Sequence, residues 1–147
     1  MTYSKNLQTV LDILKNEVDG DVQSALAKMT DDYSMTWMYK GKDELFPSTS
    51  TVMDDELEDV YHIKGRVYDI RNIAETGDVV MLEMVESYPD PDTGKMYRTP
   101  QVIVLEMKDG KIQKGRHYCD PATSYLDLTD AQIDRGLKST DTKIRVD

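Results

Sequence analysis

The pattern of apolar and polar positions divides the chain into a helical first part and a β-rich second part. Between residues 4 and 18 the apolar side chains recur at helical spacing on one face, at Leu7, Val10, Leu11, Leu14 and Val18. This spacing predicts an amphipathic helix, which Asp19-Gly20 ends. A second, short helix is predicted from Asp21, a residue type that favours helix N-caps. A third is predicted from Ser50 to about Tyr61.

Strand patterns follow these helices. β-branched and aromatic residues predict strands at residues 33–39 and 66–74, and a three-strand antiparallel meander at residues 78–121. Both faces of the first meander strand are largely apolar, so we expect each face to be covered. A short helix is predicted near residues 130–137, and residues 138–147 are polar and expected to be loose. This order predicts an α+β domain with helices on one face of a bent sheet.

The turn between the last two meander strands decides which side chains share a face with Glu86. A two-residue turn at Asp109-Gly110 would place Tyr118 and Asp120 on that face. A three-residue loop with Gly110 in a bulge position would place His117 there instead. Since a slip of one residue exchanges the faces of the whole strand, alternation alone leaves both registers open.

Composition sets the class of protein. The chain has 147 residues, 39% of them hydrophobic, which is enough for one domain that folds without covalent staples. The single Cys119 excludes an internal disulfide framework, so a cytoplasmic location is expected. No apolar run approaches the roughly 20 residues of a membrane span, and the N-terminus lacks a signal-peptide pattern. We therefore expect no membrane partner.

Charge and motifs narrow the chemistry. The net charge is −10, with the acidic residues spread along the chain, a surface that repels the phosphates of nucleic acids. A saline habitat and simple solubility both remain open as explanations. The two histidines show neither metal-ligand spacing nor a neighbouring cysteine cluster. There is no glycine-rich phosphate loop and no serine nucleophile motif, so we expect chemistry without a metal or a cofactor.

The order of elements, combined with four short segments, resembles the nuclear transport factor 2-like superfamily. These segments are Thr30-Asp31-Asp32, Thr93-Gly94-Lys95, Asp109-Gly110-Lys111-Ile112 and Arg116-His117-Tyr118-Cys119-Asp120. Within the superfamily the chain is most similar to the SnoaL-like branch, which includes polyketide cyclases, ketosteroid isomerases and limonene epoxide hydrolases. The resemblance implies a cone-shaped, curved antiparallel sheet packed on three helices, with an apolar pocket between them. It also implies a single domain at residues 1–128, a polar extension at 129–147, and a homodimer formed through the outer sheet face.

The resemblance also assigns positions in the pocket. The pocket-lining Arg and Asp of limonene epoxide hydrolases fall on Met84 and Glu86, and an Asp of the last strand falls on His117. This favours the register that places His117 in the pocket. Loss of the Arg disfavours epoxide hydrolysis, because the donor to the epoxide oxygen is missing. The general base of ketosteroid isomerases falls on Trp37, which cannot accept a proton.

A mostly apolar pocket with a few polar groups is therefore expected. Its predicted lining is Trp37, Met84, Glu86, Thr99, Gln101, Leu105, His117 and Cys119. Such a lining favours a small, flat, hydrophobic organic ligand. If Glu86 accepts a hydrogen bond from one ring nitrogen of His117, the other nitrogen becomes a better base.

This pocket predicts an isomerase, cyclase or hydratase that acts on a small hydrophobic carbonyl compound. Glu86 and His117 would be its catalytic acid–base pair, and the other six residues would contact the ligand. The alternative is a ligand-binding or dimeric scaffold protein of the same fold without catalysis. The absent Arg and the Trp at position 37 favour this alternative.

Overall fold

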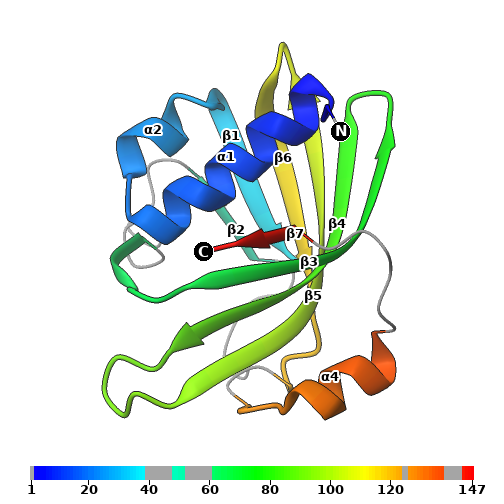
Figure 1. Cartoon of the computed structure of the whole chain (residues 1–147). Helices are drawn as coiled ribbons and strands as arrows, with labels where there is room; N and C mark the ends of the chain where they lie inside the picture. Colours follow the sequence, from blue (N-terminus) through cyan, green and yellow to red (C-terminus); the bar gives the residue numbers. More distant parts are fainter. Residues whose placement is uncertain (1, 39–47, 52–60, 124–125, 138–143) are drawn as a thin grey trace.

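The computed structural model describes residues 2–38, 48–51, 61–123, 126–137 and 144–147 (Figure 1). Three helices lie within these residues: α1 (Lys5–Asp19), α2 (Val22–Leu26) and α4 (Asp130–Gly136). The strands are β1 (Met29–Trp37), β2 (Ser48–Thr51), β3 (Val67–Thr76), β4 (Val79–Pro89), β5 (Met96–Lys108), β6 (Lys111–Tyr118) and β7 (Ile144–Val146). The helix predicted from Ser50 begins too early, because Ser50 belongs to β2. Residues 52–60 of that prediction lie outside the described residues, and Tyr61 at its predicted end is helical.

All seven described strands form one sheet in the order β2-β1-β6-β5-β4-β3-β7. Neighbouring strands are antiparallel except for β1 and β6, which run parallel. The sheet curves, and α1 lies across its concave face (Figure 1). The predicted α+β fold with a curved sheet packed on helices is confirmed.

Helix α1 packs against the concave face of the sheet. Ser4 caps its N-terminus by accepting a hydrogen bond from the backbone N–H of Leu7 at 3.0 Å. Gly20 ends it in the left-handed conformation, with φ of 74°. The buried side chains of α1 form one core with alternate residues of β4 and β5: Leu7, Val10, Leu11, Ile13, Leu14, Val80, Leu82, Met84, Ile103 and Leu105. The apolar stripe predicted for this helix is therefore its buried face.

The turn between β5 and β6 differs from the one favoured at the sequence level. Lys108 pairs directly with Lys111, so only Asp109 and Gly110 connect the strands. Both have positive φ, 51° and 78°, the combination that a tight type I′ hairpin turn requires. The three-residue loop predicted here is wrong.

A β-bulge in β6 nevertheless brings His117 to the concave face. The pairing with β5 shifts by one residue between Ile112 and Lys114, so Gln113 is an extra residue in β6. Such a bulge exchanges the faces of the residues that follow it. His117 is therefore paired with the inward-facing Ile103.

The C-terminal segment is more ordered than predicted. Helix α4 lies where a short helix was expected. Ile144–Val146 forms β7, which adds to the sheet edge beside β3, and Val146 is buried. The expectation of a loose tail is wrong for these residues, because Val146 completes the core at that edge.

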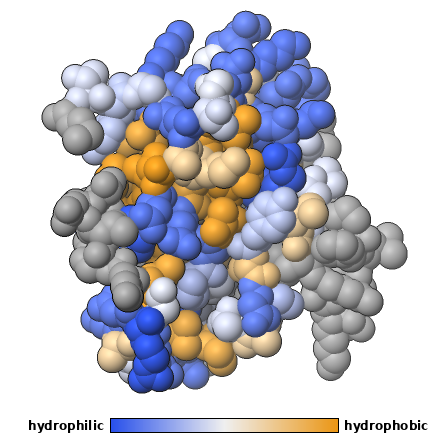
Figure 2. Space-filling model, turned by 90° about the vertical axis from the view of Figure 1, so that its right-hand side faces the viewer, coloured by the Kyte–Doolittle hydropathy of each residue, from blue (hydrophilic) through white to orange (hydrophobic). Residues whose placement is uncertain are grey.

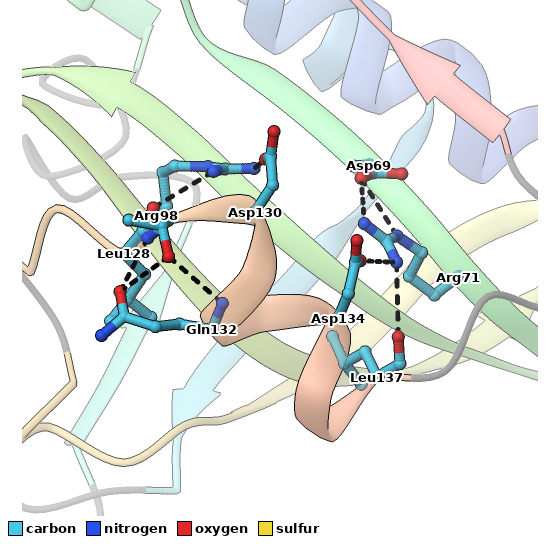
Figure 3. Close-up of polar contacts among 9 residues, drawn as sticks. Asp69, Arg71, Arg98, Leu128, Asp130, Gln132, Asp134 and Leu137 are labelled. Atoms are coloured by element: carbon cyan, nitrogen blue, oxygen red, sulfur yellow. Dashed lines mark hydrogen bonds and ion pairs between the residues drawn. The ribbon is translucent and has the colours of Figure 1, made fainter.

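Two arginines on the convex side fasten α4 to the sheet (Figure 3). Arg71 of β3 donates to Asp69 and to Asp134 of α4. Arg98 of β5 donates to the backbone carbonyl of Leu128 at 3.1 Å and pairs with Asp130 at 2.6 Å. Helix α4 is thus held by its charged residues and its capping segment.

The convex face also carries apolar surface. On the side of the molecule turned to the viewer in Figure 2, hydrophobic residues gather between polar ones. A groove of about 210 Å³ is lined by Ile73, which packs against the core, and by Ala74, Met81 and Val102 of the convex face, among others. This is the face that the predicted homodimer would use, and the dimer remains a prediction. No described helix has the length and apolar character needed to cross a membrane.

Candidate functional site

A cavity of about 300 Å³ opens between α1 and the concave face of the sheet. Its lining is drawn from α1, from β1 and β3 to β6, and from the segment that leads into β3. The lining residues are Leu14, Glu17, Met35, Trp37, Ile63, Arg66, Tyr68, Met84, Glu86, Tyr88, Gln101, Ile103 and His117. The cavity lies next to the part of the core that the buried residues of α1 form with β4 and β5.

The structure brings together five of the eight residues expected in the pocket: Trp37, Met84, Glu86, Gln101 and His117. The other three are not among its lining residues. Leu105 lies deeper, in the packed core under α1. Thr99 is buried opposite Glu86 on β5, and Cys119 follows the end of β6. The cavity lining therefore includes both residues expected from β4, whereas two expected residues of β5 and one just after β6 lie outside it.

His117 is held by Gln101 and lies beside Trp37. The Nε2 atom of His117 is 2.6 Å from Oε1 of Gln101. Since an amide oxygen only accepts hydrogen bonds, Nε2 carries the ring proton here and Nδ1 is the basic nitrogen. The Trp37 ring meets the imidazole edge-on, with centroids 6.0 Å apart. Burial lowers the pKa of His117, and the Glu86 charge partly opposes this, so the imidazole is neutral at pH 7.

Glu86 is paired with Arg66, which is not among the predicted pocket residues. Nη1 of Arg66 is 3.0 Å from Oε1 of Glu86, and the Arg66 side chain is only 3% exposed. The guanidinium also lies over the ring of Tyr88, 4.8 Å from its centroid. Burial opposes the Arg66 charge, but Glu86, Tyr68 and Glu17 outweigh it and raise the pKa of Arg66.

The pocket therefore contains the arginine that was expected to be absent. At the sequence level, Met84 replaces the arginine of the limonene epoxide hydrolases. In the structure a guanidinium reaches Glu86 from Arg66, just before the neighbouring strand β3. Arg66 could have been found by alternation, because it is two residues before Tyr68 and four before Ile70, both of which face the core.

A second carboxyl group, that of Glu17, faces the cavity from α1. The Tyr68 hydroxyl donates a hydrogen bond to Oε2 of Glu17. Burial raises the pKa of Glu17 to about 7, and the Glu86 charge adds to this, while the Tyr68 hydrogen bond and the Arg66 charge act against it. The sequence signal for Glu17 is its position three residues after Leu14, which continues the apolar stripe of α1.

The described residues contain no group of three His, Cys, Asp or Glu side chains placed to hold a metal ion. The polar groups of the cavity instead form two sets. One is the Gln101–His117 pair, and the other is the cluster of Glu17, Tyr68, Arg66 and Glu86, which we call the Arg66 cluster. Together they offer a neutral imidazole, a carboxyl that titrates near neutral pH and a fixed positive charge.

Only the comparison with solved structures finds proteins that match this chain. No family model and no curated protein matches the chain. A Bacillus subtilis protein described as a candidate isomerase is 18% identical over 81% of this chain and 88% of its own, with a TM-score of 0.66. TerC, co-crystallised with polyporic acid, is 21% identical over 81% of this chain and 94% of its own, with a TM-score of 0.65.

IdmH of Streptomyces antibioticus, described as a candidate polyketide cyclase, is 17% identical over 82% of this chain and 95% of its own, with a TM-score of 0.61. Several other matching structures are described as NTF2-like proteins. At this level of identity the likeness concerns the fold, and it agrees with the resemblance that the sequence motifs carry. The chain has the nuclear transport factor 2-like fold.

Proposed function

We propose that the protein is an isomerase, cyclase or hydratase that acts without a cofactor on a small, flat, hydrophobic carbonyl compound. In this proposal His117 is the general base, and Glu86 is the carboxylate that stabilises its protonated form. The observation that carries it is the cavity itself, which encloses the Gln101-held imidazole and the Arg66-paired carboxylate between apolar walls.

The shape and lining of the cavity support the ligand class. A volume of about 300 Å³ is at the lower end of the range for small-molecule sites and suits a ligand of one or two fused rings. The apolar lining is Leu14, Met35, Trp37, Ile63, Met84 and Ile103. Among structures of this fold, TerC was crystallised with polyporic acid and another is described as a candidate isomerase, which agrees with a small organic ligand.

The chemistry follows from the charge states. Neutral His117 accepts a proton from the carbon next to the ligand carbonyl, through Nδ1. The negative charge of Glu86 stabilises the imidazolium that forms, since it favours the charged state of His117. The negative charge that develops on the carbonyl oxygen needs a hydrogen-bond donor in the cavity. The imidazolium then returns the proton, to the same carbon or, in an isomerisation, to another one.

The test is proton exchange on β-tetralone, a flat bicyclic ketone, followed by NMR in D₂O at neutral pH. The wild-type protein is expected to accelerate exchange of the protons next to the carbonyl above the buffer rate. His117→Gln should lower this acceleration by roughly 10²-fold or more, the usual contribution of a general base. His62→Gln is the matched control, because His62 is exposed and does not line the cavity.

Two results would contradict the proposal. One is that His117→Gln accelerates the proton exchange of β-tetralone as much as the wild type does. The other is binding of β-tetralone, detected by ligand NMR, without accelerated exchange, which would support a non-catalytic ligand-binding protein instead.

A further inference from the structure

The acid–base chemistry of His117 and Glu86 does not use the carboxyl group of Glu17, although Glu17 lines the same cavity. Glu17 comes from the last turn of α1, whereas the other two residues come from the sheet. Its side chain keeps some accessible surface, as a cavity-lining group does, and the Tyr68 hydroxyl fixes its carboxyl through Oε2. A ligand in the cavity would therefore lie between the carboxyl on the helix side and the imidazole on the sheet side.

The surroundings of Glu17 favour its neutral form. The ionisable groups that act on it or on which it acts are Tyr33 of β1, Tyr61, Tyr68 of β3, Arg66 and Glu86 of β4. Burial raises the pKa of all three tyrosines, so their phenols stay neutral. The two charges that remain, on Arg66 and Glu86, already form an ion pair. Ionisation of Glu17 would add a second negative charge to a buried pair that is already balanced.

The position of the proton on Glu17 follows from the hydrogen bond. The carbonyl oxygen of a neutral carboxyl is its better hydrogen-bond acceptor, so Oε2, which accepts from the Tyr68 hydroxyl, is assigned as the carbonyl oxygen and Oε1 as the protonated one. Tyr68 thus acts as a positioning residue that leaves one O–H group of Glu17 available. This is the hydrogen-bond donor that a carbonyl oxygen in the cavity requires.

We propose that Glu17 is the general acid of the site, donating its proton to the carbonyl oxygen of the ligand while His117 removes a proton from the adjacent carbon. This inference rests on the proposed function. In the step, the C–H bond breaks and its proton moves to Nδ1 of His117, while its electron pair forms the C=C bond. The electron pair of the C=O double bond takes the proton of Glu17, whose O–H bond breaks. The products are an enol, an imidazolium and a carboxylate, and the reverse transfers restore both residues.

The step also defines the substrate class more narrowly. The Arg66 charge is already compensated by Glu86, and the acid is neutral when the site is active. A negatively charged ligand therefore finds no uncompensated positive charge in this cluster. The substrate expected is a neutral ketone or aldehyde with a hydrogen on the adjacent carbon, and its first product is the neutral enol.

The experiment is the pH dependence of β-tetralone exchange, corrected for the exchange in buffer alone. Wild-type acceleration should decrease as the pH rises through about 7, where Glu17 loses its proton. Glu17→Gln should lower the acceleration roughly 10²-fold and should abolish the decrease near pH 7. Glu83→Gln is the matched control, because Glu83 lies on the opposite face of β4 and bonds to Asn72 at 2.6 Å. It should keep the wild-type profile.

A second measurement follows the proton directly. In protein labelled with carbon-13 at the carboxyl groups of its eight glutamates, one resonance should titrate near pH 7 and should be missing from Glu17→Gln. If the wild type accelerates exchange but Glu17→Gln shows the same decrease near pH 7, the role of Glu17 is overturned while the proposed function stands. The role of Glu17 is also overturned if the resonance that is missing from Glu17→Gln does not titrate near neutral pH in the wild type. If the wild type does not accelerate exchange at all, the proposed function is overturned.

Discussion

Two buried arginines at β3 lie on opposite sides of the sheet and pair with carboxylates that differ in exposure. Arg66, just before the strand, points into the concave side and pairs with Glu86, which is 17% exposed. Arg71, within the strand, pairs on the convex side with Asp69 and Asp134, which are 27% and 55% exposed. Both guanidinium groups are almost fully buried. The difference lies in how much water reaches the carboxylates that they hold.

This difference separates a structural ion pair from a candidate site. The aspartates held by Arg71 keep part of their hydration, so Arg71 serves to fasten α4 to the sheet (Figure 3). In the Arg66 cluster the protonation of Glu17 depends on its neighbours, because burial and the Glu86 charge both raise its pKa. Arginine therefore anchors a helix on one side of the sheet. On the other side it belongs to the cluster of charges that influences the pKa of Glu17.

The largest effect is expected from removing the two guanidinium groups in turn. Arg66→Met leaves Glu86, which is only 17% exposed, without its positive partner, and this should lower the free energy of unfolding by about 3–5 kcal/mol. Arg71→Met leaves aspartates that water can solvate, so a loss of about 1–2 kcal/mol is expected. Urea unfolding at pH 7, followed by circular dichroism, measures both values.

The double variant Arg66→Met with Glu86→Gln is the control for this comparison. It removes the unpaired charge as well as the guanidinium, so it should regain part of the loss seen in Arg66→Met alone. Equal losses in the Arg66 and Arg71 variants, or no recovery in the double variant, would show that the two arginines do not differ in the way proposed.

The next effect in size is the pH dependence of stability that Glu17 causes. Its pKa is about 7 in the folded protein, against an ordinary value of 4.5. Between these two values the folded state holds a proton that the unfolded state has lost, so stability falls as the pH rises through this window. The wild type should lose on the order of 3 kcal/mol relative to Glu17→Gln between pH 4.5 and 7. Outside the window the difference should stay constant.

Urea unfolding at several pH values measures this difference. Glu83→Gln, on the other face of β4, should run parallel to the wild type over the whole range. A constant difference between wild type and Glu17→Gln from pH 4.5 to 7 would mean that the carboxyl is solvated like those of the convex side.

The fold was largely predictable from the sequence, because its signals are local. The apolar stripe of α1 predicted the helix and its buried face, and runs of β-branched and aromatic residues predicted β3, β4 and β5. The register of β6 was not predictable in the same way. The Asp109-Gly110 turn has a clear signature of its own, but the bulge at Gln113 has none, and it is the bulge that turns His117 inward.

Part of the site was predictable: Glu86 interrupts an apolar strand face, and the family resemblance placed His117 in the pocket. Glu17 and Arg66 were missed because a charged residue at the end of a helix or a strand is usually solvated. Their burial depends on partners that are distant in the sequence: Tyr68 for Glu17, and Glu86 for Arg66. No local pattern contains that pairing.

The smallest expected effect tests whether the two sides of the sheet are independent. Thr129 caps α4 by accepting a hydrogen bond from the backbone N–H of Gln132 at 3.2 Å, and the Gln132 side chain accepts from the backbone N–H of Thr129 at 2.8 Å. Thr129→Ala removes half of this capping box, so a loss of about 1 kcal/mol or less is expected. Faster amide hydrogen exchange in α4 and urea unfolding should both detect it.

Thr129→Ser keeps the hydroxyl and should restore both measurements to wild-type values. The rate of β-tetralone exchange should be unchanged in either variant, because α4 contributes no residue to the lining of the cavity. If Thr129→Ala instead altered that rate, the convex side would be coupled to the chemistry through the sheet. Arg71 and Arg98, which join α4 to β3 and β5, would then influence the position of the cavity residues on these strands as well as fasten the helix.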